Sequence, residues 1–510
     1  MTHVHQRLVL RLPKDLRKDW LVYLILSAIL LIALVVRVKY ATDNPMLDDA
    51  FITFRYVRNL AHGLGFVYNP GERILGTTTP LYALLLTPFA VAGADFVVAG
   101  KIVNILASTV TVFVVFLIAR RVFGNWPAIL AAMLMAISTN NVWAASTGME
   151  TELNVLILLL FIYAYLSQRY SITAALAAVA LVTRPDDLIL VGVIFAWQFT
   201  KVIFRKQSAE SFVRPFAIFV LCLLPWLIFA TLYFGSPLPN SIIGKVASYR
   251  VPVSENLAMY LGQYGFALDT PRALVTTILF LLGTLSILRR RDDLIILVAY
   301  FLCYSAAFVV SGARLGSGWY WQPMWPIHSI IVAGGFCFIG QVSEKSSIGA
   351  TLARFRIPIA ATVVLIVALV WAGALKARFI DPRPPDDLEW AELAAAGRWI
   401  NQNTAPNATV SLETIGAVGW YSNRYIIDEG GLVSPQVAKI NERLGSPDFF
   451  KILQTFQPDY YLAWIHGELD LVNSVPVQEE WFAAHYHPIG TFDVGANRSP
   501  YFMLFKKTAN

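Results

Sequence analysis

Cysteine and charged residues are both scarce in this sequence. Its 510 residues include three cysteines and 14% charged side chains, whereas soluble domains carry about 25% charged residues. Cys222, Cys303 and Cys337 each lie within an apolar run, and their spacing fits neither a metal site nor a disulfide framework. These shortages exclude an ordinary soluble enzyme and a disulfide-stapled scaffold.

Apolar residues, by contrast, make up 57% of the chain. They gather in runs long enough to cross the roughly 30 Å hydrocarbon core of a bilayer, so the sequence predicts a polytopic α-helical membrane protein. The net charge of +7 at pH 7 is then first a topology signal, because cytoplasmic loops of membrane proteins are rich in lysine and arginine. We expect membrane lipid as a partner and no nucleic acid.

Basic loops decide the topology. The apolar stretch 80–93 is short for a span, and counting it as one would place Arg120 and Arg121 outside, so we interpret it as an interfacial or re-entrant helix. About eleven spans then place the N-terminus and the basic loops in the cytoplasm, and the first outer loop (39–95) outside. The predicted spans are 20–38, 96–119, 126–143, 149–167, 171–183, 187–204, 213–234, 273–288, 294–311, 321–340 and 357–375.

The composition changes after the last span to that of a soluble domain. Helical stretches at 383–403 and near 446–456 alternate with short apolar strands at 408–413, 424–428 and 459–464. This alternation is typical of an α/β layer domain. The chain is therefore divided into a transmembrane domain, 1–375, and an extracytoplasmic α/β domain, 376–510.

Two aspartates begin an amphipathic helix that we predict over residues 48–62, on the outer surface. Asp48 and Asp49 would occupy its N-terminus, where the helix dipole favours ionised carboxylates. A capping pair without chemistry explains this pattern, and so does a general base at the membrane surface. Spacing alone leaves both alternatives open.

Further charged residues are predicted on the same outer side. Glu150 and Glu152 stand at the mouth of a span, where an unpaired charge costs on the order of 2–3 kcal/mol, so either solvation or a ligand explains them. Arg184 precedes two aspartates, and a local Arg–Asp pair is the alternative to an anion site. Lys245 lies in an outer loop, where basic residues are depleted, and a lipid phosphate would suit it.

A short outer loop combines Arg314 with Trp319 and Tyr320. Such aromatic residues form belts at membrane interfaces, and they also stack on sugars or prenyl chains. His328 follows among apolar neighbours at the start of a span, where a histidine is packed more often than it is catalytic.

The predicted topology brings these groups to one side of the membrane. A carboxylate that accepts a proton, together with cations that hold an anionic leaving group, makes a transfer site beside lipid. A transporter or flippase would place such groups near the bilayer midplane. That class, and a non-catalytic assembly protein that displays residues 376–510, are the alternatives to an enzyme.

The first outer loop also resembles a known family. Its segment 48-DDAFITFRYVRNLAHGLGFVYNPGERILGTT-78 is similar to the first outer loop of GT-C glycosyltransferases, above all in the branch of the mycobacterial terminal β-arabinofuranosyltransferases, whereas Thr79-Pro80-Leu81-Tyr82 differs from the usual asparagine or serine before proline. Further segments with this likeness are 147-TGMET-151, 183-TRP-185, 233-YFGSPLPN-240 with Lys245, 415-IGAVGWYS-422 and 431-GLVSP-435. The likeness covers nearly the whole chain and is most specific at Asp48.

The resemblance implies a GT-C fold and an inverting transferase in the bacterial cell membrane, in cell wall biogenesis. Such an enzyme moves a sugar, for example arabinofuranose, from a polyprenyl phosphate to an extracytoplasmic glycan, lipid or protein. It also implies that an aspartate at the exit of the first span is the base, with Asp48 preferred and Asp49 close behind.

The remaining roles combine this likeness with the residue-based reasoning above. A divalent metal, Mg²⁺ or Mn²⁺, is an open alternative, with Asp48, Asp49 and Glu150 as its ligands. The residues expected to hold the donor phosphate are Arg55, Arg184, Lys245 and Arg314. Those expected to contact sugar, lipid or acceptor are Glu150, Glu152, Tyr56, Asn240, Trp319, Tyr320 and His328. The sequence departs from the family at Asp186-Asp187, where relatives commonly have Glu-Gly.

Overall fold

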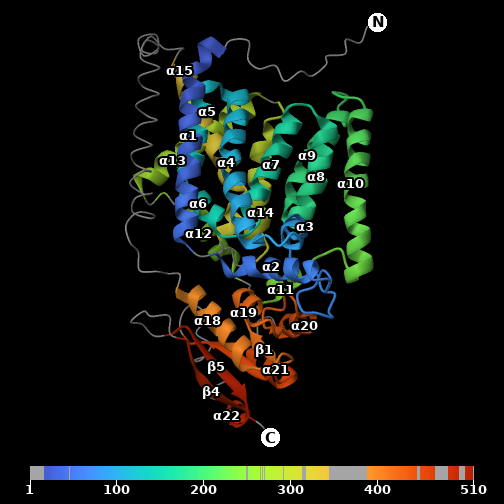
Figure 1. The fold of residues 1–510 in the computed structure, drawn as a ribbon. Helices are drawn as coiled ribbons and strands as arrows, with labels where there is room; N and C mark the ends of the chain where they lie inside the picture. Colours follow the sequence, from blue (N-terminus) through green and yellow to red (C-terminus); the bar gives the residue numbers. More distant parts are fainter. Residues whose placement is uncertain are drawn as a thin grey trace.

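The chain forms a helical bundle and, beyond one end of it, a smaller domain with a sheet (Figure 1). The computed structural model describes residues 16–508 except 45, 249–250, 265, 267, 269, 291, 313–317, 344–387, 445–447, 466–479 and 493–499. This arrangement confirms a polytopic helical protein with a C-terminal α/β domain. The predicted boundary between the two domains, at 375 and 376, lies outside the described residues.

Long apolar helices make up the bundle. Within the described ranges, four helices are long and apolar enough to cross a membrane, and a bent pair, α5 with α6, raises this to as many as five. The bundle helices are α1 (Leu16–Asp43), α4 (Phe96–Phe123), α5 (Asn125–Ala136), α6 (Thr139–Ser146), α7 (Thr151–Leu166), α8 (Tyr170–Thr183), α9 (Leu188–Ile203), α10 (Glu210–Phe234), α13 (Pro271–Arg290), α14 (Ile295–Val310) and α15 (Met324–Ser343). The predicted span 357–375 is not among the described residues, so the number of eleven stays a prediction.

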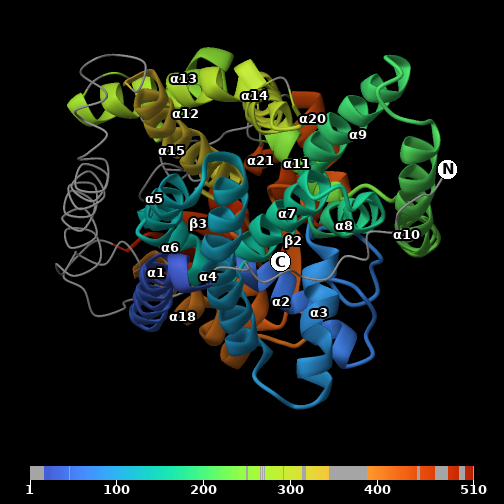
Figure 2. The same cartoon turned by 90° about the horizontal axis from the view of Figure 1, so that it is seen from above.

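Helix α10 stands at the edge of the bundle in both views (Figures 1 and 2). Only 6% of the most apolar 18-residue stretch of this helix is buried. Leu221 and Leu232 are among the most exposed large apolar side chains of the described residues. Large exposed apolar surfaces are rare on soluble proteins, whereas lipid covers them in a membrane. The helix therefore presents a lipid-facing surface.

The segment predicted as a single span, 126–143, is divided in the structure into α5 and α6, which are bent by 52° at the break between them. The guanidinium group of the buried Arg37, on α1, donates to the carbonyl oxygens of Ala136 at 2.9 Å and Met135 at 3.2 Å. A helix break in a membrane leaves such oxygens without an intrahelical donor, and Arg37 supplies one. A side chain of a different helix thus satisfies carbonyl groups next to the bend.

Basic residues stand in the last turns of three bundle helices: Arg120 in α4, Lys201 in α9 and Arg290 in α13. Arg120 pairs with Asp19 at 2.8 Å, and Lys201 pairs with Asp293 at 2.8 Å. Arg290 donates to the carbonyl oxygen of Val122 at 2.6 Å. These contacts place the ends of five bundle helices together.

Short helices lie at the opposite end, between the bundle and the sheet domain. Figure 1 shows α2 lying across this end. The predicted helix at 80–93 is found as a 12-residue helix that begins with Pro80 at its first position, where proline is tolerated. The short elements here are α2 (Asp48–Ala61), α3 (Pro80–Val91), η1 (Pro185–Asp187), α11 (Asn240–Ser248), α12 (Val253–Gln263) and η2 (Gly318–Trp321).

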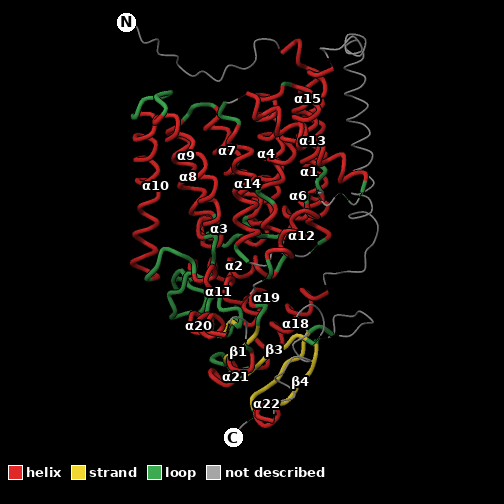
Figure 3. Tube along the Cα trace, turned by 180° about the vertical axis from the view of Figure 1, so that it is seen from behind, coloured by secondary structure: helices red, strands yellow, loops and turns green. Residues whose placement is uncertain are grey.

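The C-terminal domain is a five-stranded mixed sheet with helices around it (Figure 3). The strand order is β2-β1-β3-β5-β4; β1 runs parallel to both β2 and β3, and β5 is antiparallel to both β3 and β4. The sequence predicts the first three strands and misses the last two. The elements are α18 (Leu388–Asn403), β1 (Thr409–Leu412), α19 (Ile415–Ser422), β2 (Tyr425–Asp428), α20 (Pro435–Leu444), α21 (Phe449–Phe456), β3 (Tyr460–Trp464), α22 (Glu480–His485), β4 (Tyr486–Thr491) and β5 (Phe502–Lys507).

One apolar cluster continues from α2 into the sheet domain. Phe54 and Tyr56 on α2 belong to the same buried cluster as Val418 on α19 and Leu462 on β3. The sequence predicts α2 as a surface helix, but both of its faces are covered, because Arg55 is also buried against the C-terminal domain. The two domains are therefore packed together through α2.

Candidate functional site

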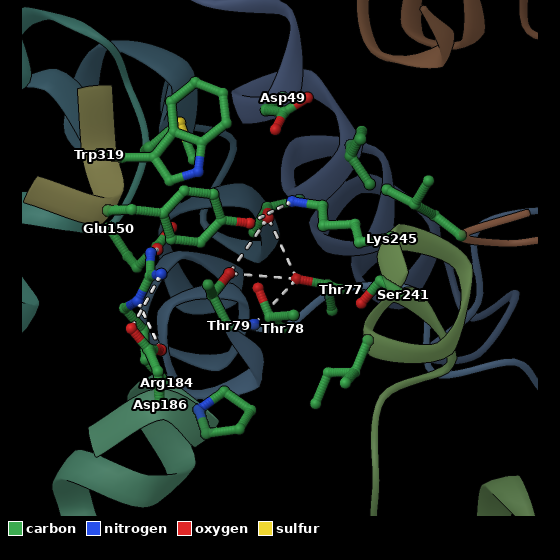
Figure 4. Close-up of a pocket in the computed structure, with 18 of the residues that line it drawn as sticks. Asp49, Thr77, Thr78, Thr79, Glu150, Arg184, Asp186, Ser241, Lys245 and Trp319 are labelled. Carbon is green, nitrogen blue, oxygen red and sulfur yellow. Dashed lines mark hydrogen bonds and ion pairs between the residues drawn. The ribbon is translucent and has the colours of Figure 1, made fainter. Parts of the chain in front are cut away.

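A cavity of about 360 Å³ lies where the bundle meets the C-terminal domain. It is lined by α2, the loop before α3, the turns at Glu150 and Arg184, and the helices α11 and α14. Figure 4 shows Asp49, Lys245 and Trp319 around this cavity, with Arg184 and Asp186 joined beside Glu150. The pocket thus unites segments that are far apart in the sequence.

Asp49 lies in the first turn of α2 and lines the pocket. Its side chain is partly buried, and it accepts no hydrogen bond from any residue that the structure describes. The first turn of a helix favours a negative charge because of the helix dipole. Both carboxylate oxygens of Asp49 are therefore free of the described residues, at the pocket surface.

Asp48, the preferred base in the sequence analysis, does not line the pocket. Its side chain is 2% exposed, and its two oxygens accept hydrogen bonds from the backbone amides of Gly416 at 2.6 Å and Ala417 at 2.5 Å. Burial raises the pKa of Asp48 to about 8, while these amide donors act in the opposite direction. The structure thus directs Asp48 to the C-terminal domain.

Arg55, predicted to hold the donor phosphate, is also directed away from the pocket. It is 1% exposed, and its nitrogens donate to Tyr68 O, Gly419 O, Asn69 Oδ1 and Arg424 O at 2.7–3.2 Å. An arginine has five N–H donors, and here they face backbone and amide oxygens of the protein. The contacts join α2 to the loop after it and to α19.

Lys245, on α11, reaches the pocket with spare hydrogen-bonding capacity. Its Nζ donates to the Tyr320 hydroxyl at 3.2 Å and lies 5.8 Å and 5.6 Å from the ring centroids of Trp319 and Tyr320. Burial by itself lowers the pKa of Lys245, but Tyr320 and Asp49 raise it overall. Lys245 forms no ion pair with a described residue, so its charge is available to an anion.

Arg184 lines the pocket too, but two carboxylates compensate its charge. It donates to Glu150 Oε1 at 2.8 Å and to the two oxygens of Asp186 at 3.0 and 3.2 Å. The local Arg–Asp pair, which the sequence leaves open as an alternative, is therefore present. Burial raises the pKa of Glu150, and Arg184 opposes this shift.

Threonine hydroxyl groups form part of the pocket wall. The Oγ1 atoms of Thr53, Thr77 and Thr79 lie 3.1–3.2 Å from one another, and all three residues line the cavity. Sequence reasoning assigned them no role. The available signal was the Gly76-Thr77-Thr78 run within the segment that resembles the GT-C loop.

Tyr56 and Asn240, which were also predicted to contact the substrate, do not line the pocket but bond to residues next to its wall. The Tyr56 hydroxyl donates to Ile74 O and accepts from the amide of Gly76, next to the threonines. Asn240 Nδ2 donates to Gly431 O at 2.7 Å and Leu432 O at 3.0 Å in the C-terminal domain.

The remaining predicted residues lie elsewhere. Glu152 is buried in the bundle and accepts from Asn141 Nδ2 at 3.5 Å. His328 packs among aromatic rings, among them Tyr264 and Phe280. Arg314 lies outside the described residues.

The three predicted metal ligands do not form a donor set. Asp48 binds the amides of α19 and Glu150 is paired with Arg184, whereas Asp49 makes no hydrogen bond to a described residue. Within the described ranges, no group of three or more histidine, cysteine, aspartate or glutamate residues is placed to hold a metal ion. These residues do not fit a divalent cation.

Comparisons with known proteins identify the fold. Residues 386–505 match a family model described as a domain of unknown function, DUF8728, and no curated protein matches the chain. ArnT from Cupriavidus metallidurans bound to undecaprenyl phosphate superposes with a TM-score of 0.56 at 12% identity, over 96% of this chain and 98% of that one.

A second group of solved structures agrees. The oligosaccharyltransferase AglB from Archaeoglobus fulgidus, in complex with an inhibitory peptide and a dolichol-phosphate, superposes with a TM-score of 0.58 at 12% identity. The match covers 94% of this chain and 80% of AglB. Both neighbours are GT-C membrane enzymes, so the predicted GT-C fold is confirmed.

Proposed function

We propose that this protein is a membrane glycosyltransferase that moves a sugar from a polyprenyl phosphate to an acceptor hydroxyl group. The proposal depends on one observation: Asp49 and Lys245 line the same cavity, and among the described residues Asp49 has no hydrogen-bond donor and Lys245 has no ion-pair partner. It is supported by the fold neighbours, since ArnT holds undecaprenyl phosphate and AglB holds dolichol-phosphate in their structures.

The chemistry follows from these two groups. Asp49 accepts the proton of the acceptor hydroxyl, and the acceptor oxygen attacks the anomeric carbon of the donor sugar. The bond from this carbon to the phosphate oxygen breaks, and the lipid phosphate leaves with the electron pair. Lys245 and the Tyr320 hydroxyl stabilise the negative charge on that phosphate. Attack opposite the phosphate inverts the anomeric configuration.

The other pocket walls suit the rest of the donor. Ile242, Ala307 and Phe308 supply apolar surface for the first prenyl units. Thr53, Thr77 and Thr79 present hydroxyl groups to the sugar. Arabinofuranose is the sugar that the sequence resemblance favours, and an extracytoplasmic glycan, lipid or protein is the acceptor.

We also propose a side of the membrane for the reaction. The basic residues at the far end of the bundle, Arg120, Lys201 and Arg290, mark that end as cytoplasmic under the positive-inside rule. The pocket and the C-terminal domain then face the outside of a bacterial cell membrane.

The test is a transfer assay on the purified protein. Undecaprenyl phosphate that carries radiolabelled glucose, mannose or arabinofuranose is the donor, and a cell-envelope extract is the source of acceptors. We expect Asp49→Asn to lower turnover about 10²–10⁴-fold, the usual contribution of a general base. Asp95→Asn, at an exposed aspartate that caps α4, is the matched control.

Two results would contradict the proposal. Asp49→Asn could retain the wild-type rate, or the wild-type protein could form no product with any of the three donors. Movement of the lipid across proteoliposomes without product would instead support a transporter.

A further inference from the structure

We infer that the C-terminal domain positions the base: Asp48 binds the N-terminus of α19, and this contact fixes the first turn of α2 and therefore Asp49. Asp48 is then a positioning residue, and the domain of unknown function acquires a role in turnover. This inference rests on the proposed function, in which Asp49 is the base.

The contact has the geometry of a helix cap supplied by a distant segment. The first amides of a helix have no intrahelical acceptor, and Thr414, which precedes α19, provides no side-chain hydrogen bond to them. Asp48 provides both bonds instead, to Gly416 and Ala417, across 368 and 369 residues of sequence. An acidic group at this position is also favoured by the dipole of α19.

Two glycines on one side of α19 allow the close approach. A Cβ atom on Gly416 would lie 1.9 Å from the backbone oxygen of Asp48, and one on Gly419 would lie 2.0 Å from the Tyr68 hydroxyl. Glycine is the residue that lets two backbones approach this closely. The spacing of three residues places both glycines toward α2 and the loop that follows it.

The same domain also braces the helix that bears Lys245. Asn240, at the start of α11, donates to Gly431 O and Leu432 O. Asp428 holds that loop by accepting from the amides of Gly430 at 2.9 Å and Val433 at 2.7 Å. The C-terminal domain therefore contacts both helices that carry the reacting groups.

Leu432 belongs to the C-terminal domain and lines the pocket itself, so this domain also forms part of the pocket wall. Adjacent residues of a helix point about 100° apart, so fixing Asp48 on α19 sets the direction of Asp49 toward the cavity. A shift of about 1 Å between reacting groups can cost 10²-fold in rate. The contact between Asp48 and α19 is thus a determinant of turnover.

The first experiment compares Asp48→Asn with Asp48→Ala in the full-length protein. Asparagine keeps one acceptor oxygen and alanine keeps none, so we expect turnover to fall less than about tenfold with asparagine and about 10–100-fold with alanine. The affinity for undecaprenyl phosphate without a sugar is expected to stay at the wild-type value. Turnover is expressed per molecule that binds this lipid, which corrects for unfolded protein.

The second variant changes no functional group. Gly416→Ala is expected to lower turnover about 10–100-fold because the methyl group separates α19 from α2. Gly262→Ala, on α12, is the control, since a Cβ there meets no atom within 4 Å. If Gly416→Ala does not fold, the isosteric Asp48→Asn still decides the question.

The outcomes separate the two proposals. Equal losses for Asp48→Asn and Asp48→Ala, at the level of Asp49→Asn, would make Asp48 a catalytic group and overturn the positioning role. Wild-type turnover in the Asp48 variants, with Asp49→Asn inactive, would overturn the positioning role and leave the transferase intact. Wild-type turnover in Asp49→Asn would instead refute the transferase mechanism.

Discussion

The pocket and the interface between the domains use the same kinds of charged residue in opposite ways. At the interface, Asp48 accepts two amide bonds and Arg55 donates to four oxygens. In the pocket, Asp49 accepts no bond from a described residue and Lys245 makes one, to a tyrosine. A single helix, α2, contributes to both regions.

This difference separates structural from functional charge. A group whose hydrogen-bonding capacity is used by the protein has none left for a substrate. A partly buried group with unused capacity on a cavity wall is available to a ligand. Partner atoms, more than residue type or sequence motif, therefore distinguish Asp49 from Asp48 and Lys245 from Arg55.

The largest expected effect at the interface is that of Arg55→Met. It removes the arginine donor from the buried carbonyl oxygens of Gly419 and Arg424, and each group left unsatisfied costs about 1–3 kcal/mol, whereas the carbonyl oxygen of Tyr68 keeps Asn59 Nδ2 as a donor. We expect the free energy of unfolding to fall by about 3 kcal/mol or more, measured by thermal unfolding in detergent. Arg121→Met, at an exposed arginine on α4, is the control.

Arg55→Met also tests the comparison directly. The molecules that remain folded should bind undecaprenyl phosphate as tightly as the wild type does. Weaker binding of the lipid at an unchanged free energy of unfolding would show that Arg55 contributes to lipid binding in the pocket rather than to the interface.

Lys245→Met is expected to have a smaller effect, on binding rather than on stability. A hydrogen bond to a charged group contributes about 1.5–3 kcal/mol, so the affinity for undecaprenyl phosphate should fall about 10–100-fold. Titration calorimetry in detergent measures the affinity, and Lys39→Met, at an exposed lysine near the end of α1, is the control. An unchanged affinity would remove Lys245 from the phosphate site.

The pH dependence of stability provides a third test. Burial raises the pKa of Asp48 to about 8 and that of Asp428 to about 7, whereas free aspartate titrates near 4. Between these values the folded protein keeps protons that the unfolded chain has released. The free energy of unfolding therefore falls as the pH rises from about 4 to about 8, by at most about 1.4 kcal/mol per pH unit for each carboxyl group.

Asp48→Asn removes the contribution of Asp48 and should reduce this slope. Asp95→Asn, at an exposed aspartate, should leave the slope unchanged. Unfolding in detergent at several pH values measures both, and a stability that rises with pH over this range would contradict the assignment.

Local patterns predicted most of the fold. Helix α2 begins at Asp48 as expected, and three strands lie within a residue of their predicted bounds. The bend between α5 and α6 was missed, and the side chain that satisfies carbonyl groups next to it, Arg37, lies on another helix. Hydrophobic runs show where a helix is and not what interrupts it.

The candidate site was predicted only in part, because contacts between residues far apart in the sequence cannot be read from local patterns. Topology brings Asp49, Lys245 and Tyr320 to one end of the bundle, and the structure places all three on one cavity. The resemblance favoured Asp48 over Asp49, and the sequence could not show the contact of Asp48 with α19, since that partner lies 368 residues away. It also passed over the threonines, because a hydroxyl group is informative only when its neighbours are known.

Those threonines give the smallest effect, and Thr79→Val is the sharpest test. Three hydroxyl groups that bond one another use their donors, but each oxygen keeps acceptor capacity for a sugar hydroxyl. One lost hydrogen bond of about 0.5–1.5 kcal/mol should raise KM for a sugar-bearing donor about 3–10-fold. Binding of undecaprenyl phosphate without a sugar should not change, because Lys245 holds the phosphate. Thr87→Val, whose hydroxyl bonds its own helix, is the control. Equal weakening with and without the sugar would show that the hydroxyl groups support the pocket, as Asp48 and Arg55 support the interface, rather than bind the substrate.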